Sequence, residues 1–256
     1  MFEIDLDGRV AIVTGGSRGI GRACVEALTA AGARCVVAYR DPARASDVAA
    51  LIDGITRLGG EAVEFCGDLT QPAVCRDLMD AAVRNFGALH IVVNNAGLWR
   101  RAEIATMTEE QLLETLDLNL KAVFRLTQQS AKAMAKMPAG GVLIQIASTA
   151  GERGEAHYSH YAAAKGAVIA MVKSLARELG PRIRINAVSP GWIETEMTAA
   201  ALAPAERRAI EAALPLRRIG LPQDVANAVV FLASDLAQWM TGAVLRVNGG
   251  GVLGED

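Results

Sequence analysis

The feature that most constrains the fold is an alternation of short apolar runs and helical stretches along all 256 residues. Each run is five to seven residues long and rich in β-branched or other apolar residues, as is typical of a buried strand. The runs span residues 9–14, 34–39, 61–65, 89–93, 141–147, 182–188 and 243–247. Helical patterns lie between and after them, at 19–31, 42–58, 71–86, 107–134, 158–179, 194–214 and 222–234. Strands that alternate with helices predict an α/β fold, with one doubly wound parallel sheet and helices on both faces.

Length and composition limit the class of protein. The length suits one large domain, and no linker or repeat divides the chain, so we expect a single domain over residues 1–256. A net charge of -2 gives no broad electrostatic reason to expect nucleic acid or an anionic membrane as a partner. No apolar run approaches the ~20 residues of a membrane span, and the first residues lack the pattern of a signal peptide.

The cysteines and histidines indicate neither a disulfide framework nor a metal site. Cys24, Cys35, Cys66 and Cys75 form no C-x-x-C pair, and the histidines have no metal-ligand spacing. We therefore expect four buried cysteines in a reducing compartment, a cytoplasmic location and no metal.

The first predicted strand runs directly into a glycine-rich turn, T-G-G-S-R-G-I-G, at residues 14–21. A strand, a glycine turn and a helix are the context of a dinucleotide-binding turn, in which N–H groups at the helix start face the phosphates. Gly15, Gly19 and Gly21 are spaced G-x-x-x-G-x-G rather than G-x-G-x-x-G. A plain tight turn is the alternative, but three glycines would cost it chain entropy without benefit. We therefore predict phosphate binding here.

The end of the second predicted strand indicates which dinucleotide binds. In NAD-specific folds an acidic residue usually ends this strand and binds the ribose 2′-hydroxyl. Here the strand ends in Tyr39 and Arg40, and Arg18 lies in the glycine turn, so two guanidinium groups are available for a 2′-phosphate. The alternative is two solvated surface arginines. The pattern favours NADP over NAD, unless the strand runs one residue further and Asp41 takes the acidic role.

Other strand ends carry further candidates for ligand contacts. Asp68 follows the third strand, where it can accept from an adenine amino group or cap the next helix, and the local sequence leaves both open. Asn94-Asn95-Ala96-Gly97 follows the fourth strand, where a doubly wound sheet places its ligand. Asn119 lies inside the helical stretch 107–134, where asparagine is unfavourable. It either faces solvent or marks a local break with a function.

Ser148, Tyr161 and Lys165 form the candidate catalytic group. Ser148 closes the fifth strand, and Tyr161 and Lys165 are four residues apart, so a helix places them on one face. A phenol ionises near pH ~10, and a nearby cation lowers that pKa. We therefore expect Lys165 to tune Tyr161 as a general acid or base, with the Ser148 hydroxyl bound to the reacting oxygen. A solvated Tyr/Lys pair on a helix face is the alternative.

The loop after the sixth strand lies at the same edge of the sheet. It reads Ser189-Pro190-Gly191-Trp192, and the Ala-rich stretch 194–214, interrupted by Pro204, follows it. We predict that this stretch forms a mobile lid over the substrate, or else a helix that only leaves and rejoins the sheet.

Together these motifs resemble the short-chain dehydrogenase/reductase family over essentially the whole chain. The resemblance rests on the glycine turn, Asn94 to Gly97, Asn119, Ser148, Y-A-A-A-K from Tyr161, and Pro190-Gly191. Ser148 lies thirteen residues before Tyr161, the family's usual gap. The chain is closest in appearance to 3-oxoacyl-acyl-carrier-protein reductases, because the similarity continues through I-E-T-E-M-T at residue 193 and V-N-G-G at residue 247.

The resemblance implies a seven-stranded Rossmann-type sheet, NAD(P) as hydride carrier and a tetrad of Asn119, Ser148, Tyr161 and Lys165. It implies that Lys165 also holds the nicotinamide ribose and that Asn119 supports a water in a proton relay to Lys165. It favours adenine as the partner of Asp68 and the carboxamide as that of Ile193. The expected cofactor contacts are Gly15, Ser17, Arg18, Gly19, Ile20, Gly21, Tyr39, Arg40, Asp68, Leu69, Asn95, Ala96, Gly97, Tyr161, Lys165, Pro190, Gly191 and Ile193. Such enzymes are usually homotetramers built on two long helices, here within 108–134 and 158–179, and the C-terminal region.

The resemblance to carrier-protein reductases is incomplete around the substrate. Such enzymes use two basic residues near the mouth of the site; Arg182 falls close to one, whereas the other falls near the uncharged Ala139. Trp99, His157 and Trp192 are bulkier than such reductases need, and they either shape a pocket for another ketone or serve only as packing.

We therefore expect an NADPH-dependent carbonyl reductase that transfers a hydride to a small-molecule ketone, with an acyl-carrier-bound 3-oxoacyl thioester as one candidate. An NAD(P)-dependent alcohol, sugar or steroid dehydrogenase is the enzymatic alternative. A dinucleotide-binding sensor or scaffold is the other alternative, and an intact tetrad argues against it, because a pure binder has no need of Ser148 and Tyr161 together. We expect the loops around 98–104, 152–158 and 194–214 to determine the substrate.

Overall fold

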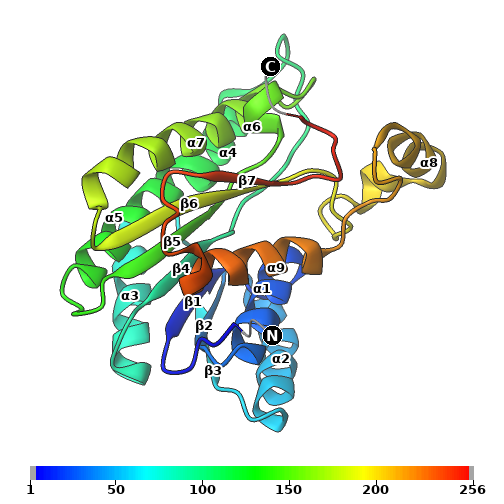
Figure 1. The fold of residues 1–256 in the computed structure, drawn as a ribbon. Coiled ribbons are helices and arrows are strands. Elements are labelled where there is room, and N and C mark those ends of the chain that lie inside the picture. The colour runs from blue at the N-terminus through cyan, green and yellow to red at the C-terminus, as the bar shows by residue number, and fades with distance from the viewer. Residues whose placement is uncertain (1–3, 254–256) are drawn as a thin grey trace.

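The computed structural model describes residues 4–253, and in this range one parallel sheet of seven strands forms the centre of the molecule (Figure 1). The strand order is β3-β2-β1-β4-β5-β6-β7, so the winding reverses between β1 and β4. All neighbouring strands are parallel, which confirms the predicted fold class. The strands are β1 Val10–Thr14, β2 Arg34–Tyr39, β3 Ala62–Cys66, β4 Ile91–Asn94, β5 Gly141–Ile146, β6 Ile183–Pro190 and β7 Val244–Val247.

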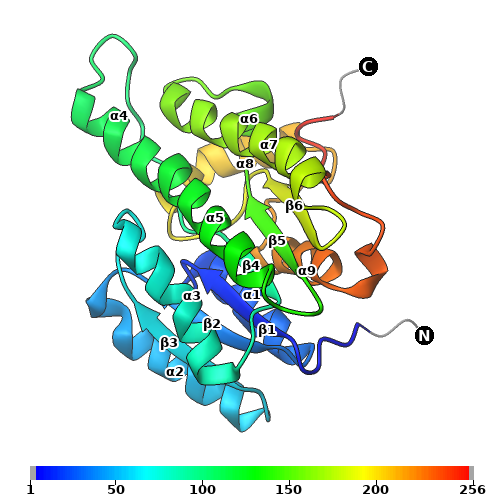
Figure 2. The same ribbon diagram turned by 90° about the vertical axis from the view of Figure 1, so that its left-hand side faces the viewer.

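Helices cover both faces of the sheet (Figures 1 and 2). One layer holds α1 Gly19–Ala30, α2 Ala45–Arg57 and α9 Pro222–Ala233, and the other holds α3 Pro72–Phe86, α5 Val123–Met134 and α7 Ser159–Leu179. In β1, Ala11 and Val13 pack into the first layer, whereas Val10 and Ile12 pack into the second. Because alternate side chains of a strand point to opposite faces, a strand buried on both faces must be apolar throughout.

The remaining helices lie near the carboxyl ends of the strands or link the main elements. They are α4 Glu109–Leu116, α6 Ala150–Arg153 and α8 Pro204–Ala213, with short 3-10 turns at Pro42–Arg44, Ala199–Leu202 and Asp235–Ala237. Figure 1 shows α8 standing out from the body of the protein. The predicted lid, 194–214, contains a 3-10 turn and then α8, which begins at Pro204, where the sequence predicted an interruption.

Three elements differ from the sequence prediction. β6 runs two residues further, through Pro190, because it pairs with β7 up to Val247. The single turn α6 replaces a predicted loop, since four residues are too few to show helical periodicity. The stretch 107–134 is not one regular helix, because a π-helical segment, Asp117–Ala122, joins α4 to α5.

All four cysteines lie within the described residues, and three of them are buried as expected. Cys66 is the exception: it is exposed at the end of β3, and its thiol donates to the Arg40 carbonyl at 3.6 Å. The described helices include none that is long and apolar enough to span a bilayer. Over the same part of the chain, no three acidic, histidine or cysteine side chains gather as a metal site would require.

Hydrogen bonds tie the ends of β1 and β4 together. Thr14 Oγ1 accepts from the backbone N–H groups of Asn95 and Ala96, both at 3.0 Å. Asn95 Nδ2 donates back to the Thr14 carbonyl at 2.8 Å. These bonds, which we call the Thr14 clasp, fix the glycine turn after β1 against the loop after β4.

Thr14→Val tests the clasp, because valine keeps the side-chain shape and removes the acceptor. The Ala96 N–H would lose its partner, and the Asn95 N–H would keep only the Val93 carbonyl at 3.1 Å. We therefore expect the free energy of unfolding to fall by about 1–3 kcal/mol in urea denaturation. Thr29→Val is the control, since Thr29 Oγ1 only donates to carbonyls within its own helix, at 2.9 and 3.1 Å. We expect it to cost less than about 1 kcal/mol, and equal losses in the two variants would count against the clasp.

Candidate active site

Three side chains meet where β5 ends beside the start of α7. Ser148 follows β5, while Tyr161 and Lys165 lie four residues apart in the first turns of α7, on one helix face. The Ser148 hydroxyl lies close enough to the Tyr161 phenol to lower its pKa, and it accepts from the Ala150 N–H at 3.1 Å. All three line one cavity at the carboxyl ends of the strands, here called the substrate cavity. The structure thus brings together the predicted candidate catalytic group.

The ionisation of Tyr161 differs from the expectation. Burial raises the pKa of Tyr161 to about 12, against the lowering effect of the Ser148 hydroxyl. The expected tuning of the phenol pKa by Lys165 is therefore wrong for this structure. Lys165 Nζ donates to the Ile146 carbonyl at 2.7 Å and lies 5.8 Å from the centre of the phenol ring. The phenol is protonated at neutral pH, which is the state that a proton donor needs.

Lys165 is a buried cation beside the phenol. Its side chain belongs to a residue only 4% exposed, and burial lowers its pKa to about 8. An ammonium has three N–H donors, and within residues 4–253 only the Ile146 carbonyl accepts one. The other two are available to a ligand in the substrate cavity, which Lys165 lines.

Asn119 lies in the π-helical segment and is fully buried, so the solvent-facing alternative is wrong. Its Nδ2 donates to the Leu98 carbonyl at 2.9 Å, and its Oδ1 accepts from the Leu98 N–H at 3.1 Å. A Cβ on Gly97 would lie 2.6 Å from Asn119 Oδ1, so any larger residue at this position would push the Asn119 side chain away. Asn119 thereby holds the loop after β4 at the substrate cavity, which it also lines. Such a break in a helix frequently marks a functional site.

The glycine turn has the shape that a dinucleotide phosphate requires. Gly15 and Gly19 have φ angles of +66° and +52°, a backbone conformation that other residues rarely adopt. A Cβ on Gly21 would lie 2.1 Å from the Gly15 carbonyl oxygen, so the start of α1 is pressed against the turn. With no side chains in the way, the N–H groups at the start of α1 can face an anion. The residues present therefore fit a dinucleotide.

A second cavity, here called the cofactor cavity, runs from the glycine turn past the end of β2. It adjoins the substrate cavity, since five residues line both: Ile20, Asn95, Gly97, Thr195 and Met197. The expected contacts that line the cofactor cavity are Gly15, Ser17, Arg18, Gly19, Ile20, Tyr39, Arg40, Leu69, Asn95, Ala96 and Gly97. Those that line the substrate cavity include Tyr161, Lys165, Pro190, Gly191 and Ile193.

Two expected contacts, Gly21 and Asp68, line neither cavity in the described part of the chain. Gly21 supports the turn from beneath. Asp68 Oδ1 accepts from the N–H of Thr70 at 2.9 Å and from its hydroxyl at 2.8 Å. Its carboxylate therefore closes the turn ahead of α3. It does not cap that helix, whose N-cap is Gln71 without a side-chain hydrogen bond, so the capping alternative is wrong.

The end of β2 lies where the sequence places it, at Tyr39. Asp41 accepts from the Ala43 N–H at 3.0 Å and caps the following 3-10 turn, so the strand does not extend to it. Arg44 lines the cofactor cavity with Arg18 and Arg40, although it was not among the expected contacts. It lies five residues after the end of β2, beyond the strand end from which the expected contacts were taken.

Aromatic side chains form one wall of the substrate cavity. Trp99 stacks on Tyr158 with ring centres 4.3 Å apart, and it meets Trp192 edge-on at 5.9 Å. Trp99 Nε1 donates to Glu155 Oε2 at 3.1 Å, and burial raises the pKa of the Glu155 carboxyl. Trp99, Trp192 and Glu155 line the cavity. Sequence analysis identified both tryptophans but missed Glu155, since a lone glutamate in a loop carries no pattern.

His157 is an exception among the bulky residues expected at the mouth. Its Nδ1 lies 2.7 Å from Glu103 Oε2 on the surface, and within residues 4–253 it is not among those that line the substrate cavity. Its expected role in shaping the pocket is therefore not supported.

Arg182 also lies elsewhere than expected. It directly precedes β6, whereas Pro190 at the other end of this eight-residue strand lines the substrate cavity. A strand of that length spans about 26 Å. Arg182 Nη2 donates to the Met137 carbonyl at 2.8 Å and so joins the loop ahead of β5. The expectation that Arg182 lies near the mouth of this cavity is wrong.

Comparison with known proteins agrees with this arrangement. The model of the family described as enoyl-(acyl carrier protein) reductase matches residues 15–251. The chain belongs to the short-chain dehydrogenase/reductase family. It is 40% identical to the 3-oxoacyl-acyl-carrier-protein reductase of Escherichia coli over 248 residues, or 96% of this chain and 98% of that protein. An uncharacterised oxidoreductase of Methylorubrum extorquens is 41% identical over the same shares of both chains.

Solved structures of the family have the same fold. A 7α-hydroxysteroid dehydrogenase in complex with NADH and 7-oxo glycochenodeoxycholic acid superposes with a TM-score of 0.92 at 35% identity, over 100% of both chains. This short-chain dehydrogenase/reductase is thus an NAD(P)-dependent oxidoreductase that acts on CH–OH or C=O groups.

The burial of Lys165 makes the stability of this family member depend on pH. Its pKa is about 8 when folded, below the ordinary value of 10.5. Between these values the unfolded chain binds more protons than the folded protein, so stability rises with pH. From pH 7.5 to 9, wild type should gain about 1 kcal/mol relative to Lys165→Met in urea denaturation.

Lys173→Met is the control, because Lys173 is exposed on the same helix. It should follow wild type over this pH range. A parallel change in wild type and Lys165→Met would show that the folded state does not disfavour the Lys165 cation.

Proposed function

We propose that this protein reduces a ketone with NADPH, and that Tyr161 donates the proton. The observation that carries the proposal is the position of the protonated Tyr161 phenol beside the Ser148 hydroxyl, in a cavity that adjoins the cofactor cavity. Protein relatives support a ketone as substrate, since the Escherichia coli protein named above is a 3-oxoacyl-acyl-carrier-protein reductase.

Each residue of the tetrad has a separate task in this proposal. The bound cofactor would supply the hydride. Ser148 and Tyr161 would both donate hydrogen bonds to the carbonyl oxygen, and Tyr161 would give its proton as negative charge develops there. Lys165 would bind the ribose with its remaining N–H donors. Asn119 would keep the loop after β4 in place and support the proton relay to Lys165.

NADPH is favoured over NADH by the charges around the end of β2. Arg18, Arg40 and Arg44 line the cofactor cavity there. Asp41 also lines it, but its carboxylate accepts from the Ala43 N–H and is outnumbered by the three guanidiniums. Arginine suits a phosphate, because its planar group donates two parallel hydrogen bonds. A solved structure titled a blue fluorescent protein in complex with NADPH, from a metagenomic library, shares the fold with a TM-score of 0.90 at 37% identity, over 97% of this chain and 100% of that one.

A hydroxylated substrate is a second candidate. The Glu155 carboxylate lines the substrate cavity beside Arg153, and carboxylates and guanidiniums bind sugar hydroxyls well. The L-rhamnose-1-dehydrogenase of Scheffersomyces stipitis is 35% identical over 96% of both chains. Arg182 lies far from the cavity and Ala139 is uncharged, so the paired basic residues of carrier-protein reductases do not flank this mouth.

A screen of β-keto esters, keto sugars and steroid ketones tests the proposal, with cofactor absorbance as the readout. Wild type should turn over at least one class with NADPH, and its kcat/KM for NADPH should exceed that for NADH about tenfold or more. Tyr161→Phe should lose at least about 100-fold in kcat, because general acid catalysis contributes that much, while NADPH binding by fluorescence titration stays within about twofold.

Tyr158→Phe is the matched control, since Tyr158 lies three residues earlier and stacks on Trp99. It should retain most of its kcat. Near-normal turnover of Tyr161→Phe would exclude Tyr161 as the proton donor. A purely binding protein would show no turnover in wild type with any class.

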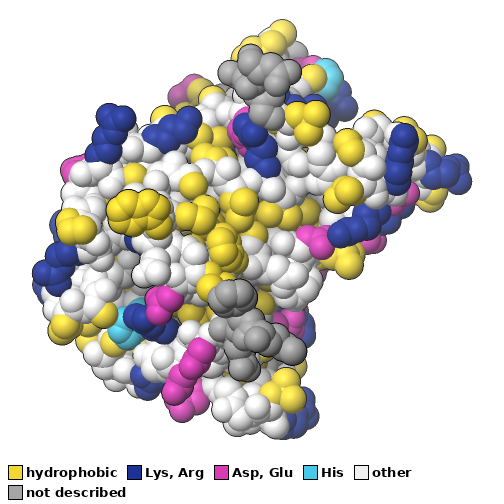
Figure 3. Space-filling view, viewed as in Figure 1, with side chains coloured by type: hydrophobic (Ala, Val, Ile, Leu, Met, Phe, Trp, Pro, Cys, Tyr) yellow, Lys and Arg dark blue, Asp and Glu magenta, His cyan; other side chains and the backbone are white. Residues whose placement is uncertain are grey.

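Exposed apolar surfaces support a homotetramer. The four free thiols fit a reducing compartment such as the cytoplasm. A band of hydrophobic side chains crosses the face over β7, which is an edge strand of the sheet (Figure 3). In the segment that joins α9 to β7, Leu236 and Trp239 are exposed. On the other side of the fold, Leu113 and Phe124 are exposed on α4 and α5. Two apolar surfaces of this kind are what a tetramer with two interfaces needs.

Light scattering should give a mass about four times the 26.9 kDa of the chain. Phe124→Glu should reduce it to that of a dimer, because a buried carboxylate without a partner opposes association. Leu58→Glu is the control: Leu58 is 91% exposed at the end of α2, outside both surfaces, and this variant should remain tetrameric. A monomeric wild type at micromolar concentration would contradict the assembly.

A further inference from the structure

The lid places a carboxylate between two arginines of the cofactor cavity. Glu196 Oε2 lies 2.6 Å from Arg18 Nη1 and 2.7 Å from Arg44 Nη2. Arg18 comes from the glycine turn, Arg44 from the turn after β2 and Glu196 from the loop after β6, and all three line the cofactor cavity. One oxygen atom thus joins three segments that are far apart in the sequence.

The charges of this group fit a phosphate better than they fit Glu196 alone. Two guanidiniums face one carboxylate, and they hold the pKa of Glu196 below its ordinary value, chiefly through the hydrogen bond from Arg18. Arg44 has Asp47 as a second partner at 3.0 Å. An oxygen shared by two guanidiniums is the position that a phosphate oxygen takes in a charge-assisted pair.

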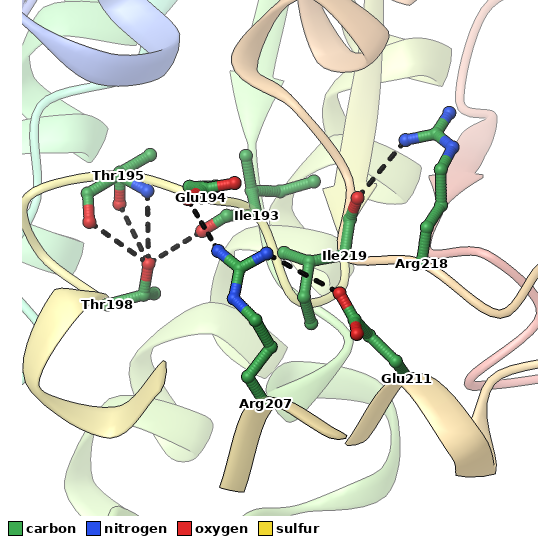
Figure 4. Close-up of polar contacts among 8 residues, drawn as sticks. All are labelled: Ile193, Glu194, Thr195, Thr198, Arg207, Glu211, Arg218 and Ile219. Carbon is green, nitrogen blue, oxygen red and sulfur yellow. Dashed lines mark hydrogen bonds and ion pairs between the residues drawn. The ribbon is translucent and has the colours of Figure 1, made fainter. Parts of the chain in front are cut away.

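The loop that carries Glu196 is braced as a unit, as Figure 4 shows for its neighbours. The Thr198 hydroxyl donates to the Ile193 carbonyl at 2.6 Å and accepts from the Thr195 N–H at 3.1 Å, which closes the loop on itself. Arg207 on α8 reaches Glu194 at 2.5 Å. A displacement of Glu196 is therefore passed to its neighbours in the loop and to α8.

Residues of the same loop also line the substrate cavity. Thr195 and Met197, on either side of Glu196, line both cavities, and Thr198 lines the substrate cavity. The position of Glu196 and the shape of the substrate cavity are consequently linked through adjacent residues.

We propose that Glu196 is a built-in competitor of the cofactor's 2′-phosphate, and that its displacement from Arg18 and Arg44 releases the lid. A phosphate dianion and the Glu196 carboxylate cannot share one pair of guanidiniums, because like charges at contact distance repel strongly. A dinucleotide with a free 2′-hydroxyl has no charge with which to displace the carboxylate, so the lid stays attached. Glu196 thus makes the lid respond to NADPH and not to NADH. The inference rests on the proposed NADPH preference.

The competition sets a measurable penalty on phosphate binding. The side chains of Arg18 and Glu196 are about half exposed, at 53% and 52%. Exposed ion pairs are worth little individually, so breaking the two pairs of Glu196 should weaken phosphate binding about fivefold in total. By reciprocity, the bound phosphate weakens the attachment of the lid by the same factor.

The test uses the full-length protein and two small probes, 2′,5′-ADP and 5′-AMP, in isothermal titration calorimetry. Wild type should bind 2′,5′-ADP at least about tenfold more tightly than 5′-AMP. Glu196→Gln should bind 2′,5′-ADP about fivefold more tightly than wild type does and leave 5′-AMP binding unchanged. Glu194→Gln is the matched control, because it removes a lid carboxylate that pairs with Arg207 instead, and it should leave both affinities unchanged.

Hydrogen exchange gives a second readout, which follows the lid itself. In wild type, 2′,5′-ADP should speed exchange of the backbone amides in 193–202, whereas 5′-AMP should not. In Glu196→Gln these amides should exchange faster before any probe is added.

The outcomes distinguish a failure of the Glu196 competition from a failure of the proposed NADPH preference. Equal wild-type affinity for the two probes would overturn the NADPH preference, and with it the role of Glu196. A tenfold preference in wild type with no gain in Glu196→Gln would overturn the competition alone. An equal gain in Glu194→Gln would show that loosening the lid, rather than freeing the two arginines, causes the effect. Exchange in 193–202 that 2′,5′-ADP slows would mean that the phosphate closes the lid, contrary to the proposal.

Discussion

The chemistry of this protein depends on the edge at which its parallel strands end. Parallel strands present their last backbone groups on the same side, and these groups need partners that the sheet no longer supplies. The Thr14 clasp satisfies N–H groups of Asn95 and Ala96 at this edge, and the Ile146 carbonyl accepts from Lys165. The edge is thus both the end of the sheet and the floor of the two cavities, so any loss of alignment between β1, β4 and β5 would displace the site.

The second constraint is the free-energy cost of burying a cation and a phenol in the same site. Burial moves the two groups in opposite directions, lowering the pKa of Lys165 to about 8 and raising that of Tyr161 to about 12. In each case it opposes the charged form. The protein keeps the phenol neutral and holds the ammonium with one carbonyl, which leaves hydrogen-bonding capacity for ligands. If all three N–H donors of Lys165 had protein partners, the ammonium would be easier to bury but would have no donor left for a ligand.

Sequence patterns predicted the fold well, because its determinants are local. The alternation of strands and helices, the end of β2 and the glycine turn each depend on neighbouring residues, and each lies where expected. The group of Ser148, Tyr161 and Lys165 could also be predicted from the sequence, because a strand end and a four-residue helical spacing fix it. The pKa of Tyr161 could not be predicted, since it depends on burial, which no local pattern reports.

Contacts between distant segments were beyond sequence reasoning. Glu196 and Arg44 are 152 residues apart, and nothing in either segment indicates the other. The prediction for Arg182 failed for a related reason. Arg182 lies at the start of β6, whereas the cavity lies at the end of that strand. Asp68 shows the remaining limit, because a carboxylate before a helix satisfies a turn and a ligand equally well until its partners are seen.

The uneven burial of the cysteines has a practical consequence. Burial raises the thiol pKa of Cys24, Cys35 and Cys75, and the thiolate is the form that alkylating reagents attack. Cys66 is exposed, and its sulfur lies 3.6 Å from the carbonyl of Arg40, a residue that lines the cofactor cavity. A maleimide dye would therefore label the natural protein at one place, next to a residue that lines the cofactor cavity. The natural sequence thus already contains a labelling site from which nucleotide binding can be followed by fluorescence.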